Sequence, residues 1–203
     1  DALVLLQAAV GIAPQNSEAW NNLGSVWLMR QEWNNAIMCF RRALAIDPNQ
    51  PAVMSNLGMT LPHVNRVDEA VRELEAALRL DPDKDNTRIY LAALLMKNQR
   101  MPEAAGHFAA YLRHHPEDGP THVIYGTILL ALGRNPEALR EYETAVQLQP
   151  DDAELQNNYG IALGRAGRVA EALPHFRAAL RLKPDFAQAR ENAEHAARSL
   201  ERK

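Results

Sequence analysis

The chain has 203 residues, a formal net charge of -3 and a pI of about 6.2, and 47% of its residues are hydrophobic while 23% are charged. This composition predicts a folded protein, and its charge gives no general attraction to a phosphate backbone, so we expect no nucleic-acid partner. Cys39 is the single cysteine, which excludes an intrachain disulfide and a cysteine-rich zinc site, and no apolar run reaches the roughly 18 to 20 residues that a membrane span needs.

A period of 34 residues runs through the chain. Proline recurs at that interval at Pro48, Pro82, Pro116, Pro150 and Pro184, and alanine recurs at Ala36, Ala70, Ala104, Ala138 and Ala172. A third column holds the small residues Gly24, Gly58, Ala92, Gly126 and Gly160, and a fourth holds the large apolar residues Phe40, Leu74, Phe108, Tyr142 and Phe176. A fixed period of this length indicates an array in which each repeat is one supersecondary unit.

Each period contains two predicted helices, a first helix (A) and a second helix (B). Apolar residues recur three or four apart in both halves, as at Leu74, Ala77 and Leu78, and the alternation typical of strands is missing. Small residues in fixed columns allow the A and B helices to approach closely. The recurring proline ends each B helix, because a residue before proline is displaced from the α region.

These columns resemble the tetratricopeptide repeat (TPR) family, whose unit is a 34-residue helix-turn-helix. The resemblance implies an all-α fold, a right-handed superhelix or α-solenoid of helix-turn-helix repeats, formed as one array over residues 1–203. In chain order, residues 1–16 are then the second helix of a partial repeat, the full repeats are 17–50, 51–84, 85–118, 119–152 and 153–186, and residues 187–203 form a C-terminal capping helix.

The two ends of the predicted array differ in polarity. The closing segment 189–203 is heavily charged, as a capping helix should be. The opening segment presents Leu3, Val4, Leu5 and Leu6 with no preceding A helix to cover them, so we expect this edge to pair with another copy or to mark a truncation. Because the chain begins with Asp1, we also expect that an upstream segment is absent. The compartment is left open, with the cytoplasm favoured and the periplasm compatible.

Two prolines fall at unusual positions in the predicted helices. Pro62 lies near the end of the A helix in the second full repeat, and Pro174 lies inside the B helix of the fifth. Either proline should free a carbonyl and bend its helix. Terminal turns or solvent-facing surfaces could absorb the bend, or Pro62 could reshape a binding surface locally.

In the TPR family the A helices line a concave groove, and the resemblance implies which side chains face it. The candidate ligand-binding residues are Asn22, Asn56, Met59, Ile89, Tyr90, Met96, Val123, Ile124, Thr127, Leu130, Asn158, Ile161, Arg165 and Asn192. Amides are expected at the ends of this groove and an apolar patch in its middle. The positions that hold a carboxylate clamp in heat-shock cochaperones carry no cation here, so that partner class is not expected.

The sixth position of the repeats is asparagine at Asn22, Asn56, Asn158 and Asn192, and it is Tyr90 or Ile124 in the two repeats between. A carboxamide has both a donor and an acceptor, so a row of them can pair with successive peptide units of an extended chain. The row is similar to the asparagine ladder of the O-linked N-acetylglucosamine transferase repeats, which bind extended peptide. A structural role, bridging neighbouring helices or facing water, is the alternative. We expect Asn22 to contact ligand and its neighbour Asn21 only to face water.

Catalytic chemistry is not expected from this sequence. His114 and His115 are adjacent on a predicted helix end without a third ligand at metal spacing, and Cys39 lies on a B helix without a patterned histidine partner. We therefore predict that the chain is not an enzyme and has no catalytic residue, no metal site and no cofactor.

The leading functional prediction is a non-catalytic protein-protein interaction module that binds a partner protein or extended peptide in the groove. The first alternative is a self-assembling scaffold, for which self-association would use the N-terminal half-repeat. The second is the TPR arm of a larger enzyme such as a glycosyltransferase. Concentration-dependent mass separates the first two, and the full-length reading frame tests the third.

Overall fold

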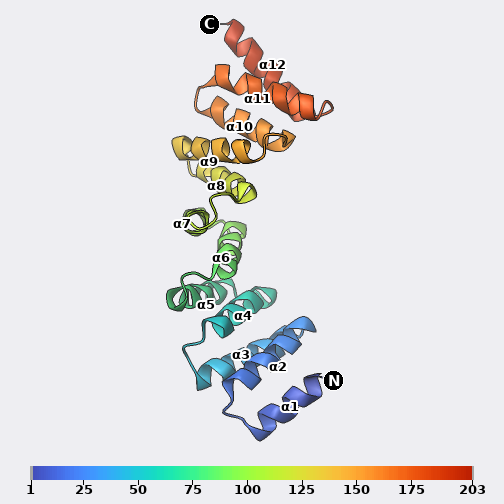
Figure 1. Cartoon of the computed structure of the whole chain (residues 1–203), viewed down its shortest axis with the longest axis vertical. Helices are drawn as coiled ribbons and strands as arrows, with labels where there is room; N and C mark the ends of the chain where they lie inside the picture. The colour runs from blue at the N-terminus through green and yellow to red at the C-terminus, as the bar shows by residue number, and fades with distance from the viewer. Residues whose placement is uncertain (1, 203) are drawn as a thin grey trace. The chain divides into compact units, whose positions relative to one another are not determined.

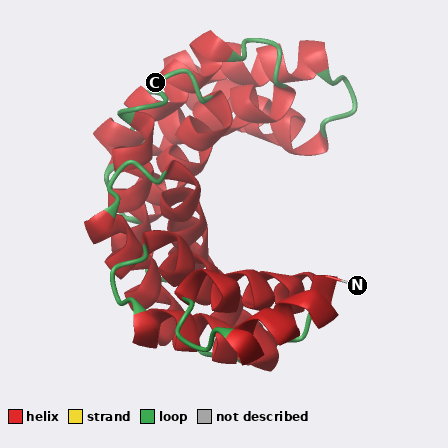
Figure 2. Ribbon diagram, turned by 60° about the horizontal axis from the view of Figure 1, so that its bottom comes forward, coloured by secondary structure: helices red, strands yellow, loops and turns green. Residues whose placement is uncertain are grey.

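The computed structural model describes residues 2–202, and this part of the chain is an all-helical structure without strands (Figures 1 and 2). The all-α prediction is therefore confirmed. The helices in chain order are α1 (Ala2–Ile12), α2 (Ser17–Met29), α3 (Trp33–Ile46), α4 (Pro51–Thr60), the 3-10 helix η1 (Leu61–Val64), α5 (Val67–Leu80), α6 (Asp85–Lys97), α7 (Met101–Leu112), α8 (Gly119–Ala131), α9 (Asn135–Leu148), α10 (Ala153–Arg165), α11 (Val169–Leu182) and α12 (Ala187–Glu201).

The chain divides into two compact units, Asp1–Arg100 (unit 1) and Met101–Lys203 (unit 2). Unit 1 contains α1 to α6, and unit 2 contains α7 to α12. The boundary falls inside the third predicted repeat, between its A helix α6 and its B helix α7. A single array over the whole chain stays a prediction.

Within a repeat, the A helix packs on its own B helix through the small-residue and large-apolar columns. A Cβ atom built on Gly24 would lie 2.6 Å from the Phe40 ring, and one built on Gly160 would lie 2.6 Å from the Phe176 ring. Phe40 and Phe176 are both buried. The backbone of the A helix therefore approaches the aromatic ring of the B helix more closely than any side chain would allow.

The turn between the A and B helices has one residue in the left-handed region in every full repeat. These residues are Gln31, Asn65, Gln99, Gly133 and Gly167, with φ between 60° and 77°. The next residue closes the helix with a bond to the carbonyl five residues earlier, as from Arg134 N to Leu129 O at 2.8 Å. Glycine supplies this conformation without a steric penalty in the last two repeats, whereas amide side chains accept it in the first three.

A fourth-position side chain ties most A helices to the loop before them, which the sequence analysis did not identify. Trp20 Nε1 donates to Pro14 O at 3.0 Å, and His122 Nε2 lies 3.1 Å from Pro116 O. Gln156 and Arg190 donate in the same way to Pro150 O and Pro184 O, and Arg88 donates to Pro82 O. The carbonyl of the proline that ends each preceding B helix is satisfied by this contact.

The two unusual prolines have different local effects. Helix α4 stops at Thr60, and Pro62 lies in η1, which tightens the last turn. Helix α11 continues through Pro174 from Val169 to Leu182. The bend expected at Pro62 is therefore a change of helix type. His63 lies in the same turn, and its ring stacks on Trp33 with centroids 4.0 Å apart.

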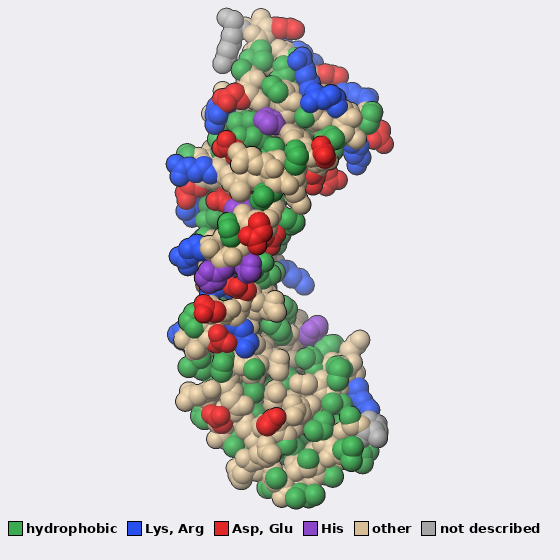
Figure 3. Space-filling model, in the orientation of Figure 1, with side chains coloured by type: hydrophobic (Ala, Val, Ile, Leu, Met, Phe, Trp, Pro, Cys, Tyr) green, Lys and Arg blue, Asp and Glu red, His purple; other side chains and the backbone are tan. Residues whose placement is uncertain are grey.

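Charged side chains are distributed unevenly along the chain. On the face shown in Figure 3 they are sparse over the segment that contains α1 to α4 and dense over the segment that contains α9 to α12. Several pairs join a turn arginine to a glutamate three residues later, as Arg134 to Glu137 and Arg168 to Glu171, each at 2.5 Å. These exposed pairs contribute little to stability.

Candidate functional site on the A helices

The predicted groove residues all lie on A helices or on the closing helix α12, and none of the fourteen is buried. Six of them belong to unit 1: Asn22, Asn56, Met59, Ile89, Tyr90 and Met96. Eight belong to unit 2: Val123, Ile124, Thr127, Leu130, Asn158, Ile161, Arg165 and Asn192. The predicted apolar patch is divided between the units, so its two parts are treated separately.

Two sixth-position asparagines bond to fifth-position asparagines of the preceding repeat. Asn56 Nδ2 donates to Asn21 Oδ1 at 3.1 Å, and Asn192 Nδ2 donates to Asn157 Oδ1 at 2.9 Å. The expectation that Asn21 only faces water is therefore wrong, since Asn21 is half-buried and accepts a hydrogen bond from the next A helix. Its counterpart Asn157 is 1% exposed, and its Nδ2 has no hydrogen-bond partner among the described residues.

The side chains of the other two sixth-position asparagines, Asn22 and Asn158, have no hydrogen bond within residues 2–202. The reason is visible for Asn158, because the fifth position of the preceding repeat is Val123, which offers no side-chain acceptor. Tyr90 replaces the amide in the third repeat and donates from its hydroxyl to Met59 O at 3.1 Å. Asn22 and Asn158 therefore keep donors and acceptors that an incoming ligand can use.

Unit 2 contains a hollow of about 280 Å³ between α8, α9 and α10, which we call the tyrosine hollow. It is lined by Thr127, Leu130, Ala131, Tyr142, Asn158, Ile161 and Arg165. The Tyr142 hydroxyl and Thr127 Oγ1 are 2.8 Å apart, and burial raises the pKa of Tyr142, so the phenol stays protonated at neutral pH. Arg165 is exposed, and no described carboxylate lies within 4.0 Å of its guanidinium.

A second hollow of about 200 Å³ lies one repeat further on, between α10, α11 and α12. We call it the phenylalanine hollow, and it is lined by Ile161, Gly164, Val169, Ala172, Phe176, Asn192, His195 and Ala196. Phe176 occupies the repeat position of Tyr142, and Asn192 occupies that of Asn158. The two hollows share Ile161, which lines both on the same helix α10.

Unit 1 has a related hollow of about 290 Å³, lined by Pro62, His63, Tyr90, Ala93, Leu94 and Lys97. Lys97 stands at the thirteenth position of its repeat, the position that Arg165 occupies in the fifth. The 3-10 turn at Pro62 thus contributes to the lining of a hollow.

The remaining predicted groove residues do not line these hollows. Val123 packs against the core of unit 2, whereas Ile124 is 38% exposed. Met59 contributes its backbone carbonyl to Tyr90, and Ile89 and Met96 are half-buried on α6. Asn22 and Asn56 also lie outside the hollows.

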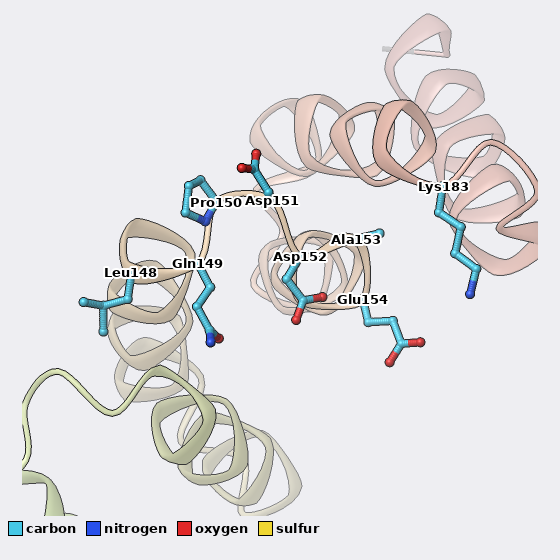
Figure 4. A pocket seen from close by; sticks show the side chains of 8 residues that line it. All are labelled: Leu148, Gln149, Pro150, Asp151, Asp152, Ala153, Glu154 and Lys183. Carbon is cyan, nitrogen blue, oxygen red and sulfur yellow. The ribbon is translucent and has the colours of Figure 1, made fainter.

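Another hollow, of about 690 Å³, lies at the loop between α9 and α10 (Figure 4). Gln149, Asp152, Glu154 and Lys183 extend to one side of this loop, and Asp151 points to the other side. Asp152 is already engaged, because its side chain accepts the Leu155 N–H at 3.0 Å and caps α10. The hollow is a feature of the connection between repeats, and we assign it no ligand.

Metal binding and thiol chemistry each require a particular arrangement of side chains. No group of three or more His, Cys, Asp or Glu residues there is placed to hold a metal ion. Cys39 is buried, and desolvation raises the pKa of its thiol to about 11, so the thiolate nucleophile is not formed near neutral pH. None of the described helices is both long and apolar enough to cross a membrane.

Comparison with solved structures places the fold among repeat proteins. YrrB, described as a TPR protein with an unusual peptide-binding site, matches with a TM-score of 0.79 and 18% identity over 93% of this chain and 97% of that one. MamA AMB-1 matches with a TM-score of 0.72 and 22% identity over 84% of this chain and 93% of that one. MamA from Desulfovibrio magneticus RS-1 gives a TM-score of 0.67 and 18% identity over 84% of this chain and 97% of that one. No curated protein sequence matches the chain.

Three family models, each described as tetratricopeptide repeat, match residues 17–50, 63–122 and 126–187. Together they cover most of the chain, including helix α10, which lines both the tyrosine and the phenylalanine hollow. The matches and the all-helical α-solenoid fold support a protein-interaction module. The chain belongs to the tetratricopeptide repeat family.

Proposed function

We propose that the chain is a docking module with no chemistry of its own, which holds an extended segment of a partner protein against the A helices of unit 2. The observation that carries this proposal is the tyrosine hollow. Five of the residues that line it, Thr127, Leu130, Asn158, Ile161 and Arg165, are also groove residues that the resemblance to the TPR family implied.

An extended polypeptide suits this surface better than a compact ligand does. The unpaired amide of Asn158 can donate to one peptide carbonyl and accept from one peptide N–H, which is the pairing that a backbone in extended conformation offers. Ile161 and Leu130 supply apolar walls beside it. The hollow can therefore take one side chain while Asn158 fixes the backbone next to it.

The test begins with a random twelve-residue peptide library displayed on phage and selected on the immobilised chain. Enriched peptides are then measured by fluorescence anisotropy against the chain and against Asn158→Ala. We expect Asn158→Ala to weaken binding about fivefold, as the loss of one or two hydrogen bonds would do. Gln147→Ala is the matched control, because it removes an exposed amide from the B helix α9. Equal affinities for the two variants and the unmodified chain would place the site elsewhere.

Self-association is a second candidate function, favoured by the surface of α1. Val4 is 61% exposed, Leu5 is 71% exposed and Ile12 is 85% exposed, an apolar surface that a second copy could cover. We expect the sedimentation mass to rise with concentration and the double variant Leu5→Glu, Ile12→Glu to stay monomeric. Leu80→Glu makes the same kind of substitution elsewhere in unit 1, with one added charge instead of two, and serves as the control. A mass independent of concentration in the unmodified chain contradicts this candidate.

A further inference from the structure

The tyrosine and phenylalanine hollows lie on neighbouring repeats of unit 2, on the two sides of helix α10. The distance between them is therefore about the distance between one A helix and the next. Helices α10 and α12 contact each other directly, and packed helices lie about 8–10 Å apart. Ile161 is the shared wall of the two hollows. A ligand that fills both must therefore carry two groups about one helix spacing apart.

The polyproline II conformation meets this requirement. It has three residues per turn and rises about 3.1 Å per residue, so side chains at i and i+3 project from the same face about 9 Å apart. A β-strand rises about 3.3 Å per residue and presents side chains i and i+2 on one face, only about 7 Å apart. The geometry of the hollows thus favours side chains three residues apart on a polyproline II segment.

The two hollows differ in chemistry. The tyrosine hollow contains the Arg165 guanidinium without a carboxylate partner and the Asn158 amide without a hydrogen-bond partner, among the residues described. The Arg165 guanidinium can pair with a negatively charged oxygen, and the Asn158 amide can bond to the peptide backbone beside it. The phenylalanine hollow is walled by Ile161, Val169, Ala172 and Phe176, which suits an aliphatic side chain.

Charge in the groove supports the acidic group. Arg165 is the only ionised residue among the fourteen predicted groove residues. The related hollow of unit 1 has Lys97 at the same repeat position, and no described carboxylate pairs with it. A cation therefore stands at this repeat position beside one hollow in each unit.

We propose that the groove of unit 2 selects an extended partner segment that carries an acidic side chain for the tyrosine hollow and an aliphatic side chain three residues away for the phenylalanine hollow. This inference rests on the proposed docking function and adds the chemistry of its ligand. Arg165 pairs with the carboxylate, Asn158 holds the intervening backbone, and the aliphatic side chain lies against Phe176.

The first experiment measures a panel of fluorescein-labelled ten-residue peptides in a Pro-Ser host by fluorescence anisotropy with the full chain. One set places Glu and Leu at i and i+3 in both orders, and other sets place them at i and i+2 or at i and i+4. We expect the i, i+3 set to bind about tenfold more tightly, since only it buries the leucine. Replacing its Glu by Gln should weaken binding about fivefold, and added salt should remove that difference.

The second experiment uses variants of the two hollows. Arg165→Gln should abolish the preference for Glu over Gln, whereas Arg181→Gln, an exposed arginine of α11, should keep it. Gly164→Phe should fill the phenylalanine hollow, because a Cβ at Gly164 meets nothing within 4 Å, and should weaken Leu-containing peptides about tenfold. Gly106→Phe is the control, since Gly106 is also a helix glycine with open space around it.

The outcomes separate this inference from the docking function on which it rests. If library-selected peptides lose affinity in Asn158→Ala but show no preference for an acidic residue or for the i, i+3 spacing, the inference is overturned and docking stands. If the panel peptides bind to Arg165→Gln and to Gly164→Phe with the same affinity as to the unmodified chain, the inference is also overturned. If no selected peptide responds to Asn158→Ala, both proposals fail.

Discussion

In the fourth repeat Tyr142 packs beside Gly126 and its hydroxyl bonds Thr127, whereas in the fifth repeat Phe176 packs beside Gly160 and Ile161 replaces the threonine. The two repeats are adjacent in unit 2, so the same helix pair can be compared with different side chains. The aromatic ring has the same structural role in both. What changes is that the tyrosine hollow contains the Tyr142–Thr127 hydroxyl pair, whereas apolar side chains occupy both positions in the phenylalanine hollow.

A second contact joins the same two positions in both repeats, but the histidine is on a different helix in each. In the fourth repeat His122 Nδ1 lies 2.7 Å from Glu141 Oε2, and in the fifth repeat His175 Nδ1 lies 2.8 Å from Gln156 Oε1. The imidazole is on the A helix in one case and on the B helix in the other. The comparison teaches that the repeat position determines which atoms meet, while the chemistry at that position is free to vary.

The largest expected difference between the two repeats comes from the glycine column. A Cβ at Gly160 would lie 2.6 Å from the Phe176 ring, whereas one at Gly126 would lie 3.2 Å from the Tyr142 ring. Gly160→Ala should therefore lower the free energy of unfolding by about 1–3 kcal/mol. Gly126→Ala should leave the free energy of unfolding almost unchanged. Alanine stabilises a helix by about 0.5–1 kcal/mol relative to glycine, and this gain offsets the cost of the milder contact with Tyr142.

Urea denaturation of both variants, followed by circular dichroism, checks this prediction. The control is Gly164→Ala, at which the added Cβ meets nothing and only the helix gain should appear. Equal destabilisation by Gly126→Ala and Gly160→Ala would show that the two A-B contacts relax to the same extent.

An intermediate effect is expected from exchanging the polar pair. His122→Gln keeps a donor for Pro116 O, as Gln156 has for Pro150 O, but its amide oxygen then faces the acceptor Glu141. We expect this single change to cost about 1–2 kcal/mol. The double variant His122→Gln, Glu141→His reproduces the pair of the fifth repeat and should recover most of the loss. A double-mutant cycle from urea midpoints measures the coupling between the two positions. If the effects of the two single variants simply add, the swapped pair does not restore the contact and the prediction is wrong.

The packing columns could be read from the sequence because side-chain volume at a fixed spacing is visible without coordinates. Gly160 was assigned to a small-residue column and Phe176 to a large apolar column, and the structure shows that the Phe176 ring lies against Gly160. The asparagine contacts could not be resolved in this way. Whether Asn192 or Asn158 is paired depends on the fifth residue of the preceding repeat, Asn157 or Val123, and that register between repeats appears only in three dimensions.

The donor column at the fourth position was missed for a different reason. Trp20, Arg88, His122, Gln156 and Arg190 share neither size nor charge, only an N–H that reaches a proline carbonyl six residues earlier. A search for recurring donors, rather than for recurring residue types, would have found it. The hollows were beyond the sequence, because their volumes depend on several side chains from three helices at once.

The smallest expected effect is a pH dependence specific to the fifth repeat. Burial lowers the pKa of His175 below its usual 6.5, although nearby Glu171 acts in the opposite direction. The unfolded chain then binds the proton more readily than the folded one, so the stabilisation is complete above about pH 6.5 and is lost as the pH falls toward the lowered value. His175→Gln removes the titrating group, and its amide can still donate to Gln156 Oε1. Urea midpoints from pH 8 to pH 5.5 should therefore fall more steeply for the unmodified chain than for His175→Gln, and parallel profiles would mean that the buried imidazole accepts its proton without cost.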